Sequence, residues 1–327
     1  MKKKKSKFKI MKFLLLEFVF CCIFTPIIAF HGPFDNVKNT LVGMSMTTMT
    51  HQWIAKLFLS DSEIQDILNE NCVETLSQSK EGLDNIHISS NGENNVKLSV
   101  LGGSRFKAYL LEISNPKKVK VGYAKNLGKV GEPTSEIAAG FNAIAAINGG
   151  SFNDETSNGT KYSGTGAYPQ GVLMSEGKVL WKTVGLNTKI EIIGINNEGK
   201  LMLGKYTINQ LKTLNCKEAL CYGPYLIVDG KKAKIKGDGG YGMAPRTAIG
   251  QKRDGTILFL VVDGTVIKRD GLRMDELQDI LYENGAYTAA NLDGGSSVTM
   301  YYNGEVINNP CDSVGERPVP SIFYVEP

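Results

Sequence analysis

The sequence contains few histidines, and it places them away from its most distinctive stretches. The three histidines, His31, His51 and His87, all precede the glycine-rich segments described below. A serine–histidine–acid triad needs a histidine beside its nucleophile, so we do not expect that chemistry. No cysteine pair has the spacing of a zinc site, and no Cys/His cluster is present. We therefore predict neither a catalytic triad nor a metal centre of this kind.

Cysteines are also sparse. Two lie in the apolar N-terminal segment and four lie in the rest of the chain: Cys21 and Cys22, and then Cys72, Cys216, Cys221 and Cys311. An even number outside the N-terminal segment permits disulfides. Cys216 and Cys221 are close enough in sequence to pair across a turn, but the sequence does not determine the pairing.

The basic pI of about 8.5 is largely due to the first 30 residues. When these are removed, 30 basic and 32 acidic side chains remain, and the remainder is slightly acidic. No basic patch stands out in it. Because nucleic-acid binding depends on clustered positive charge, we expect no nucleic-acid partner.

The N-terminus combines seven lysines between Lys2 and Lys12 with an apolar run over residues 13–30. A basic flank before an apolar run is typical of a secretory signal or an uncleaved anchor. About 20 apolar residues span a bilayer, and residues 27–30 offer no clean cleavage site. We favour an anchor, with the C-terminal part outside the cell membrane. Secretion after cleavage is the alternative.

The rest of the chain divides into two parts by composition. Residues 31–95 predict a juxtamembrane region and linker, and residues 96–327 predict the main domain. Turn signals recur through this domain between apolar segments, which is typical of antiparallel sheet. Residues 207–214 and 274–283 predict short helices with one apolar face. The expected fold class is α+β, with mixed, mostly antiparallel sheets, a few helices and a single main domain.

Two glycine-rich stretches follow apolar segments of strand length. The segment 143–147 leads into Asn-Gly-Gly-Ser at residues 148–151, and the segment 289–292 leads into Asp-Gly-Gly-Ser-Ser at residues 293–297. Glycines allow tight bends and leave backbone N–H groups uncovered. A lone Asp-Gly turn has an ordinary structural interpretation. Two such loops at the ends of buried strands favour a shared polar cleft.

Two charged residues complete the pattern. Arg246 follows Pro245 and precedes a predicted strand, and its neighbours leave room for a ligand. The alternative interpretation is that Arg246 is a surface cation. Asp263 ends the wholly apolar segment 258–262. An acid in that position is better placed for chemistry than an acid in an ordinary turn.

Five ordered motifs together resemble the phosphodiester glycosidase family. They are AINGGSF at 146–152, PQG at 169–171, PRTAIG at 245–250, VDG at 262–264 and NLDGGSS at 291–297. The resemblance covers roughly residues 96–327, and bacterial members are often described as exopolysaccharide biosynthesis proteins. Many relatives have a third glycine where this chain has Ser296, a change that leaves the acid in place.

The resemblance implies hydrolysis of a sugar C1–oxygen bond in a sugar-1-phosphodiester, as part of cell-surface polysaccharide or glycan metabolism, without a cofactor. It implies Asp293 as nucleophile or base, Asp263 as second carboxylate and Arg246 on the phosphate. The implied substrate-binding residues are Asn148, Gly149, Gly150, Gln170, Gly171, Thr247, Asn291, Gly294, Gly295, Ser296 and Ser297. The expected partners are a carbohydrate or phosphoglycan substrate and the membrane.

Two alternatives remain open at this point. The same polar groups suit a surface-tethered binder of phosphate-containing polysaccharide without turnover. Three acids, Asp154, Asp263 and Asp293, supply the hard oxygens that calcium prefers, although no EF-hand-like spacing is present.

Overall fold

A computed structural model of the protein describes residues 2–46, 51–88, 95–102, 106–154, 165–264, 271–312 and 315–327, with side chains from residue 9 onward. The chain divides into two compact units. The helical unit comprises Met1–Cys72 and Lys236–Gly242, and the β-sheet unit comprises Val73–Ile235 and Met243–Pro327.

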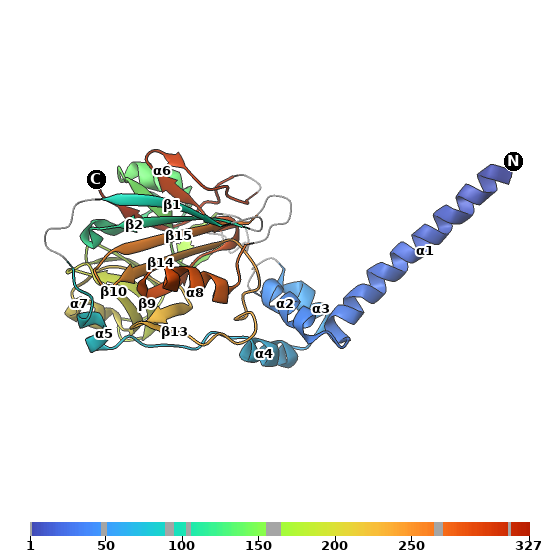
Figure 1. The fold of residues 1–327 in the computed structure, drawn as a ribbon, viewed down its shortest axis with the longest axis horizontal. Helices are drawn as coiled ribbons and strands as arrows, with labels where there is room; N and C mark the ends of the chain where they lie inside the picture. Colours follow the sequence, from blue (N-terminus) through green and yellow to red (C-terminus); the bar gives the residue numbers. More distant parts are fainter. Residues whose placement is uncertain are drawn as a thin grey trace. The chain divides into compact units, whose positions relative to one another are not determined.

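The helical unit contains four helices: α1 (Lys2–His31), α2 (Asp35–Met46), α3 (Gln52–Phe58) and α4 (Asp61–Glu70) (Figure 1). Residues Lys9–His31 of α1 form a helix long and apolar enough to cross a membrane, and most of its surface is exposed. The expected N-terminal apolar segment is therefore a helix, of the kind found in a signal sequence or an anchor. Helix α4 is capped by Ser60, whose hydroxyl accepts from the N–H of Glu63 in a capping box.

The β-sheet unit contains three large sheets and one short ribbon. The seven-stranded sheet has the order β1 (Val96–Gly102), β2 (Lys107–Ile113), β15 (Ile257–Asp263), β14 (Arg246–Lys252), β16 (Ala286–Leu292), β12 (Tyr225–Val228) and β13 (Lys231–Lys232). One five-stranded sheet has the order β10 (Leu201–Tyr206), β9 (Ile190–Asn196), β11 (Cys216–Leu220), β7 (Val172–Ser175) and β8 (Lys178–Lys182).

The other five-stranded sheet has the order β18 (Glu305–Val306), β17 (Met300–Tyr302), β4 (Ala145–Asn148), β19 (Ser321–Val325) and β3 (Val119–Tyr123), and the ribbon pairs β5 (Phe152–Asn153) with β6 (Tyr168–Pro169). Every strand pairing among the described residues is antiparallel. The prediction of an α+β fold with mostly antiparallel sheets is confirmed.

One core joins the three sheets. Phe259, Ile193 and Phe323 come from different sheets, and all are fully buried in it. Because strands such as β15 have apolar neighbours on both faces, they consist of an unbroken apolar run rather than an alternating one. This explains why segment 257–262 contains no outward-facing polar residue.

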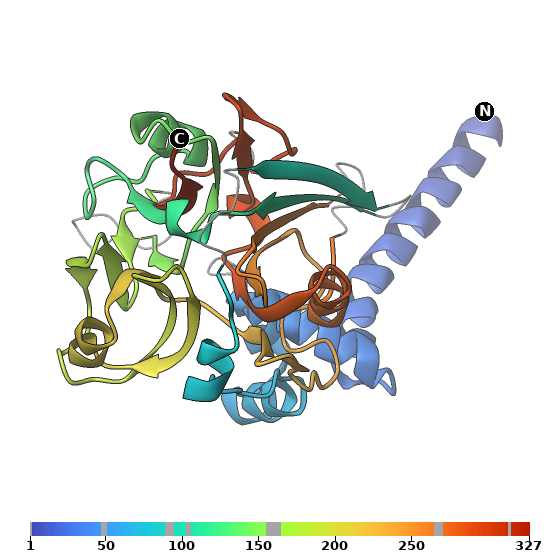
Figure 2. The same ribbon diagram turned by 60° about the vertical axis from the view of Figure 1, so that its left-hand side comes forward.

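Short helices cover the sheets: α5 (Lys80–Asp84), α6 (Thr134–Gly140), α7 (Ile208–Thr213) and α8 (Met274–Glu283), with 3-10 turns η1 (Pro116–Lys118) and η2 (Gly295–Ser297). Helix α8 has the predicted bounds and lies against the seven-stranded sheet, where Gln278 Nε2 donates to the Leu226 carbonyl at 2.7 Å (Figure 1). Helix α7, also predicted, packs beside the yellow strands of the β9–β11 sheet (Figure 2).

The structure corrects one idea about the cysteines. Cys216 begins strand β11 and Cys221 directly follows it, so an extended strand separates them rather than a turn. Two residues five apart in a strand are too distant for a disulfide. Both are free thiols.

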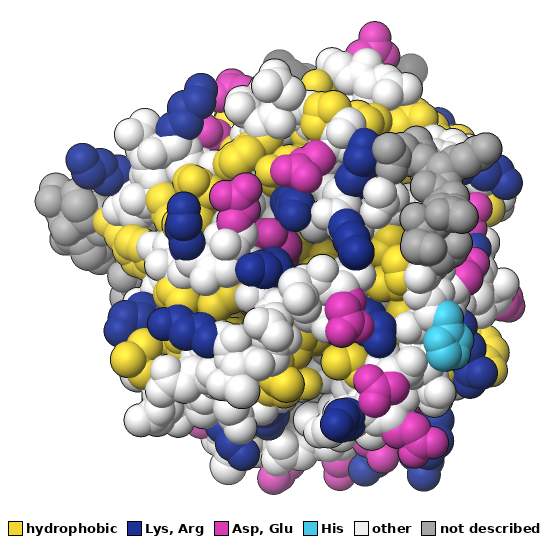
Figure 3. Space-filling view, turned by 90° about the vertical axis from the view of Figure 1, so that its left-hand side faces the viewer, with side chains coloured by type: hydrophobic (Ala, Val, Ile, Leu, Met, Phe, Trp, Pro, Cys, Tyr) yellow, Lys and Arg dark blue, Asp and Glu magenta, His cyan; other side chains and the backbone are white. Residues whose placement is uncertain are grey.

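The surface charges agree with the nearly equal numbers of basic and acidic side chains after residue 30. On the face shown in Figure 3, Lys and Arg side chains are interspersed with Asp and Glu. This face presents no patch of a single sign.

Candidate active site

Three predicted residues lie at the same end of three neighbouring strands in the seven-stranded sheet, because of the directions in which those strands run. Strand β14 is antiparallel to both neighbours, β15 and β16, so its first residues lie beside the last residues of each. Arg246 pairs with Val262, one residue before Asp263, and Thr247 pairs with Leu292, one residue before Asp293. The register therefore brings Arg246, Asp263 and Asp293 to neighbouring positions from three separate motifs.

The fully buried Asn148 connects the other glycine-rich stretch to this edge. Its Nδ2 donates to the backbone carbonyl of Asp293 at 2.6 Å. Its Oδ1 accepts from the Thr247 hydroxyl at 2.6 Å and from the Thr299 N–H at 3.2 Å. These partners define which side of the carboxamide donates and which accepts. One side chain thus joins three motifs that are far apart in sequence.

Asp293 is a partly exposed residue, and its carboxyl has a phenol partner. The hydroxyl of Tyr222 donates to its Oδ1 at 3.2 Å. Burial raises the pKa of Asp293 above its ordinary value, and the Ser297 hydroxyl, the Arg317 charge, Tyr222 and the Gly294 N–H partly offset that rise in pKa. The Ser297 hydroxyl lies close enough to influence this pKa, although its geometry falls short of a hydrogen bond.

The glycines of the two stretches have different surroundings. A Cβ on Gly149 would lie 2.7 Å from the Ser321 carbonyl oxygen, and one on Gly150 would lie 2.6 Å from the Cys221 carbonyl oxygen. The N–H groups of Gly149 and Gly150 donate to Ser321, so they are already used inside the protein. Both glycines are therefore closely packed, and their predicted role in substrate binding would not use these two amides.

The second stretch is open at one position. Gly295 has a positive φ of 60°, and a Cβ placed on it would meet no described atom within 4 Å. Its N–H donates to the Pro245 carbonyl at 3.0 Å, which attaches the loop to the start of β14. A Cβ on Gly294 would lie 4.0 Å from Nη1 of Arg246, so the guanidinium lies beside this loop.

Arg246 is almost fully buried, and its Nε donates to the Leu272 carbonyl at 3.0 Å. A second arginine, which the sequence analysis did not assign, reaches the same loop. Arg317 Nη1 donates to the Ser296 hydroxyl at 3.2 Å, and its Nη2 pairs with Asp154 at 2.9 Å. Arg317 and Tyr222 lie outside the five motifs, and only long-range contacts reveal them.

Asp263 has a different environment from Asp293. Its Oδ1 accepts from Asn308 Nδ2 at 2.9 Å and its Oδ2 accepts from the Asn309 N–H at 2.9 Å. Asn308 in turn donates to the Val298 carbonyl at 3.1 Å. Burial raises the pKa of Asp263, and these bonds partly offset that effect. Both carboxylate oxygens are therefore occupied in holding the segment that follows the Asp293 loop.

The remaining predicted residues lie at varying positions around this edge. Asn291 Nδ2 donates to the Gly223 carbonyl at 3.0 Å, and Gly171 packs so closely that a Cβ would lie 2.4 Å from the Cys221 sulfur. The Gln170 side chain is exposed and donates to Asn153. Asn291 and Gly171 thus contact the Cys221–Gly223 segment, and Gln170 contacts the strand that contains Asn153.

Three buried polar atoms near Asp293 have no hydrogen-bond partner within the described part of the chain. They are Asn291 Oδ1, Ser297 Oγ and Thr299 Oγ1, all from the segment that contains the candidate acid. A buried acceptor or hydroxyl without a partner is costly, so such atoms usually meet water or a ligand. Their clustering marks this segment as one suited to polar groups.

The calcium alternative receives no support from the arrangement of the acids. Among the described residues, no group of three His, Cys, Asp or Glu side chains has a geometry that would hold a metal ion. Asp154 is paired with Arg317, and Asp263 with Asn308.

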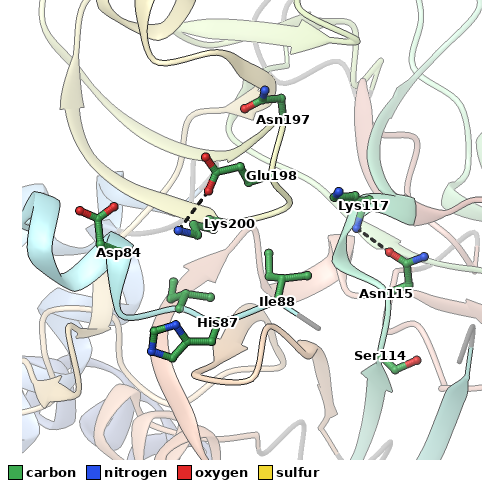
Figure 4. A pocket seen from close by; sticks show the side chains of 10 residues that line it. Asp84, His87, Ile88, Ser114, Asn115, Lys117, Asn197, Glu198 and Lys200 are labelled. Atoms are coloured by element: carbon green, nitrogen blue, oxygen red, sulfur yellow. Dashed lines mark hydrogen bonds and ion pairs between the residues drawn. The ribbon is translucent and has the colours of Figure 1, made fainter. Parts of the chain in front are cut away.

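A separate pocket of about 660 Å³ lies elsewhere in the β-sheet unit (Figure 4). His87, Lys117 and Lys200 line it, and Lys200 pairs with Glu198 at 3.0 Å. None of the predicted site residues lines this pocket. The chemistry-bearing groups are therefore at the edge formed by β14, β15 and β16.

Comparison with known proteins agrees with the fold and the motifs. A family model described as Phosphodiester glycosidase matches residues 141–326. The N-acetylglucosamine-1-phosphodiester alpha-N-acetylglucosaminidase of Mus musculus is 30% identical over 109 residues, which cover 33% of this chain and 19% of the mouse protein. An uncharacterized SPbeta prophage-derived protein, YomE, of Bacillus subtilis (strain 168) is 37% identical over 75 residues, covering 23% of this chain and 12% of YomE.

The catalytic domain of the zebrafish N-acetylglucosamine-1-phosphodiester alpha-N-acetylglucosaminidase has a similar fold. The two chains superpose with a TM-score of 0.57 at 20% identity, covering 78% of this chain and 87% of the zebrafish chain. The sequence matches span less than a fifth of the length of the curated relatives. The family match nevertheless extends over more than half of the chain and contains all five motifs. The protein therefore belongs to the phosphodiester glycosidase family.

Proposed function

We propose that the protein is a hydrolase that cleaves the C1–oxygen bond of a sugar-1-phosphodiester in a cell-surface polysaccharide or glycan. The observation that best supports this is that two acids at the ends of buried strands differ in their hydrogen-bond partners and in their burial. Asp263 uses both oxygens to hold Asn308 and Asn309. Asp293 is less buried as a residue than Asp263, its Oδ1 accepts from the Tyr222 hydroxyl, and the Arg317 charge acts on its carboxyl. Asp293 is the acid available for chemistry.

The leaving group determines what such a site needs. A phosphomonoester is anionic and weakly basic, so its departure from C1 requires less protonation than an ordinary alcohol does. The usual pair of carboxylates, one acting as a strong acid, is therefore not essential. The site does need a carboxylate to attack the sugar or activate water, and cations to stabilise the departing phosphate.

The proposed roles follow from position. Asp293 acts as base or nucleophile: in the base case it takes a proton from water, whose oxygen bonds to C1 while the phosphomonoester leaves with the electron pair. Arg246 binds the phosphate, because a guanidinium fork matches two phosphate oxygens. Asn291, Ser297 and Thr299 supply polar atoms for sugar hydroxyls. Asp263 positions the loop instead of reacting.

Helix α1 suggests where this reaction takes place. A lysine-rich flank remains in the cytoplasm, so an uncleaved α1 would tether the β-sheet unit outside the membrane. There, carbohydrate polymers of the cell surface are within reach. A cleaved α1 would give a secreted enzyme with the same chemistry.

The proposal is tested by incubating the purified full chain with an N-acetylglucosamine-1-phosphodiester, the bond named for the curated relatives, and measuring released reducing sugar. Asp293→Asn and Arg246→Lys should each lower kcat/KM at least about a hundredfold, roughly 2.7 kcal/mol of transition-state stabilisation. The lysine keeps a charge but loses the fork.

Asp263→Asn is the matched control. It should lower the thermal unfolding temperature, because it removes an acceptor for the Asn309 N–H, and it should reduce turnover much less than Asp293→Asn. Sugar binding without release would favour the tethered binder instead. Full turnover by Asp293→Asn would exclude the proposed role of that acid.

A further inference from the structure

Arg317 lies between an acid and the candidate loop. Its Nη2 pairs with Asp154 at 2.9 Å, its Nη1 donates to the Ser296 hydroxyl at 3.2 Å, and its guanidinium lies 5.0 Å from the centre of the Phe152 ring. The Arg317 side chain keeps 22% of its surface exposed, whereas Asp154 keeps 5%. The guanidinium is thus held by Asp154 and Ser296, and it also lies over the Phe152 ring.

Asp154 is itself fixed in place. Its Oδ1 accepts from the N–H of Gly166 at 2.8 Å, while its Oδ2 faces Arg317. A buried carboxylate with two charge-assisted or backbone bonds has little freedom to move. Because a fork places two N–H groups at a set angle, the Asp154 end determines where the Ser296 end points.

Ser296 belongs to the loop that carries Asp293, so the pair reaches the candidate acid from outside its own strand. The charged or titratable groups that face this loop come from separate elements. Tyr222 donates to Asp293, Arg246 lies beside Gly294, Arg317 contacts Ser296, and Cys311 Sγ donates to the Gly295 carbonyl at 3.4 Å. Of the two cations, Arg317 is the one whose charge lowers the pKa of Asp293 against the larger effect of burial.

We propose that Arg317, oriented by Asp154, is a positioning residue that fixes the Asp293–Ser297 loop and holds a positive charge close to the Asp293 carboxyl. This rests on the proposed role of Asp293 in the reaction. Arg246 is then left to bind the substrate phosphate, and the two arginines have separate tasks.

The test measures the titration of Asp293 without substrate. The full chain, ¹³C-labelled at aspartate carboxyls and held in detergent, is titrated by NMR, and the Asp293 signal is assigned by its loss in Asp293→Asn. Arg317→Gln should raise the pKa of Asp293 by about one unit, because it removes an opposite charge near the carboxyl. Arg317→Lys should leave that pKa close to the wild-type value and lower kcat/KM about tenfold, since an ammonium cannot hold Asp154 and Ser296 together.

Asp154→Asn should not raise the pKa of Asp293, in contrast to Arg317→Gln. Removing this negative charge should leave the pKa of Asp293 unchanged or lower it, while kcat/KM falls as the Arg317 fork loses its orientation. Arg253→Gln is the control: it removes one exposed cation, beside the Tyr287 ring, at the far end of β14 and should change neither quantity.

An unchanged Asp293 titration in Arg317→Gln overturns the inference. The outcomes separate it from the proposed function. A shifted titration in a protein that releases no sugar would retain the positioning role and refute the hydrolase. Sugar release with an unshifted titration would do the reverse.

Discussion

The two glycine-rich stretches of this protein have nearly the same sequence and different structural roles. Both follow a buried strand, and Asn148-Gly149-Gly150-Ser151 differs from Asp293-Gly294-Gly295-Ser296 only at its first position. Asn148 is fully buried, and both ends of its carboxamide are hydrogen-bonded, whereas Asp293 is a partly exposed residue. The glycines differ in the same sense, because Gly150 is wedged against backbone and Gly295 faces open space.

This comparison shows that a shared pattern does not imply a shared task. In the first stretch the absence of a Cβ permits the close approach of other strands, and the asparagine links three motifs. In the second stretch the same absence leaves room beside an acid. The first stretch therefore acts as the support for the second, and the bond from Asn148 Nδ2 to the Asp293 carbonyl is the direct connection between them.

The largest effect on stability is expected from exchanging the first residues of the two stretches. Asn148→Asp removes the donor to the Asp293 carbonyl and buries a carboxylate, so it should cost about 3 kcal/mol of unfolding free energy. Asp293→Asn should cost almost none at neutral pH, because it removes a charge that burial disfavours. Urea unfolding of both variants measures the difference.

The pH dependence of Asn148→Asp has a definite sign. Burial raises the pKa of the new carboxyl in the folded state above its value in the unfolded chain. Its protonated form contributes stability below the unfolded pKa, and that contribution is lost as pH rises through the folded pKa. The deficit should therefore shrink at acid pH. Equal losses in the two exchanged variants would remove the distinction between support and reactive loop.

A smaller effect on stability is expected at the wedged glycine. In Gly150→Ala the new methyl would meet the Cys221 carbonyl oxygen at 2.6 Å and Leu220 Cδ1 at 3.0 Å. The backbone partner cannot give way without moving a strand end, so the cost should be about 2 kcal/mol. Thermal unfolding checks this. A fully stable Gly150→Ala would show that the first stretch has as much room as the second.

The smallest effect is expected at the open glycine. Gly295→Ala meets no atom but forces alanine into a left-handed conformation, at a cost of about 1 kcal/mol. Gly304→Ala is the matched control, since Gly304 also has positive φ and open surroundings, in the β17–β18 turn. Both variants should lose similar stability. Only Gly295→Ala should lower kcat/KM, about tenfold, and equal turnover would place the substrate elsewhere.

Local signals predicted much of the fold correctly. The apolar run ending at Asp263 and the helix at 274–283 each depend on neighbours in sequence, and each occurs where expected. The family was also recognisable, because its motifs are contiguous. The sequence predicts a shared polar cleft for the glycine-rich stretches. It does not give the strand register that brings Arg246 and Asp293 together.

Other features required the structure. Tyr222 and Arg317 reach Asp293 and Ser296 across 71 and 21 residues of chain, and no short pattern encodes such contacts. The occupation of both Asp263 oxygens depends on the return of a hairpin 45 residues later. The engagement of the Gly149 and Gly150 amides likewise depends on Ser321, near the C-terminus.

The sequence by itself determined the apolar N-terminal helix, the turns, the buried strands and the family, because hydrophobic spacing and glycine conformations act over a few residues. Only the tertiary structure decided which glycines are packed and which are open, which acid has both oxygens hydrogen-bonded to the chain, and which arginine contacts the loop. The physical reason is that burial and pairing depend on which distant strand ends come together, and in an antiparallel sheet the register sets that.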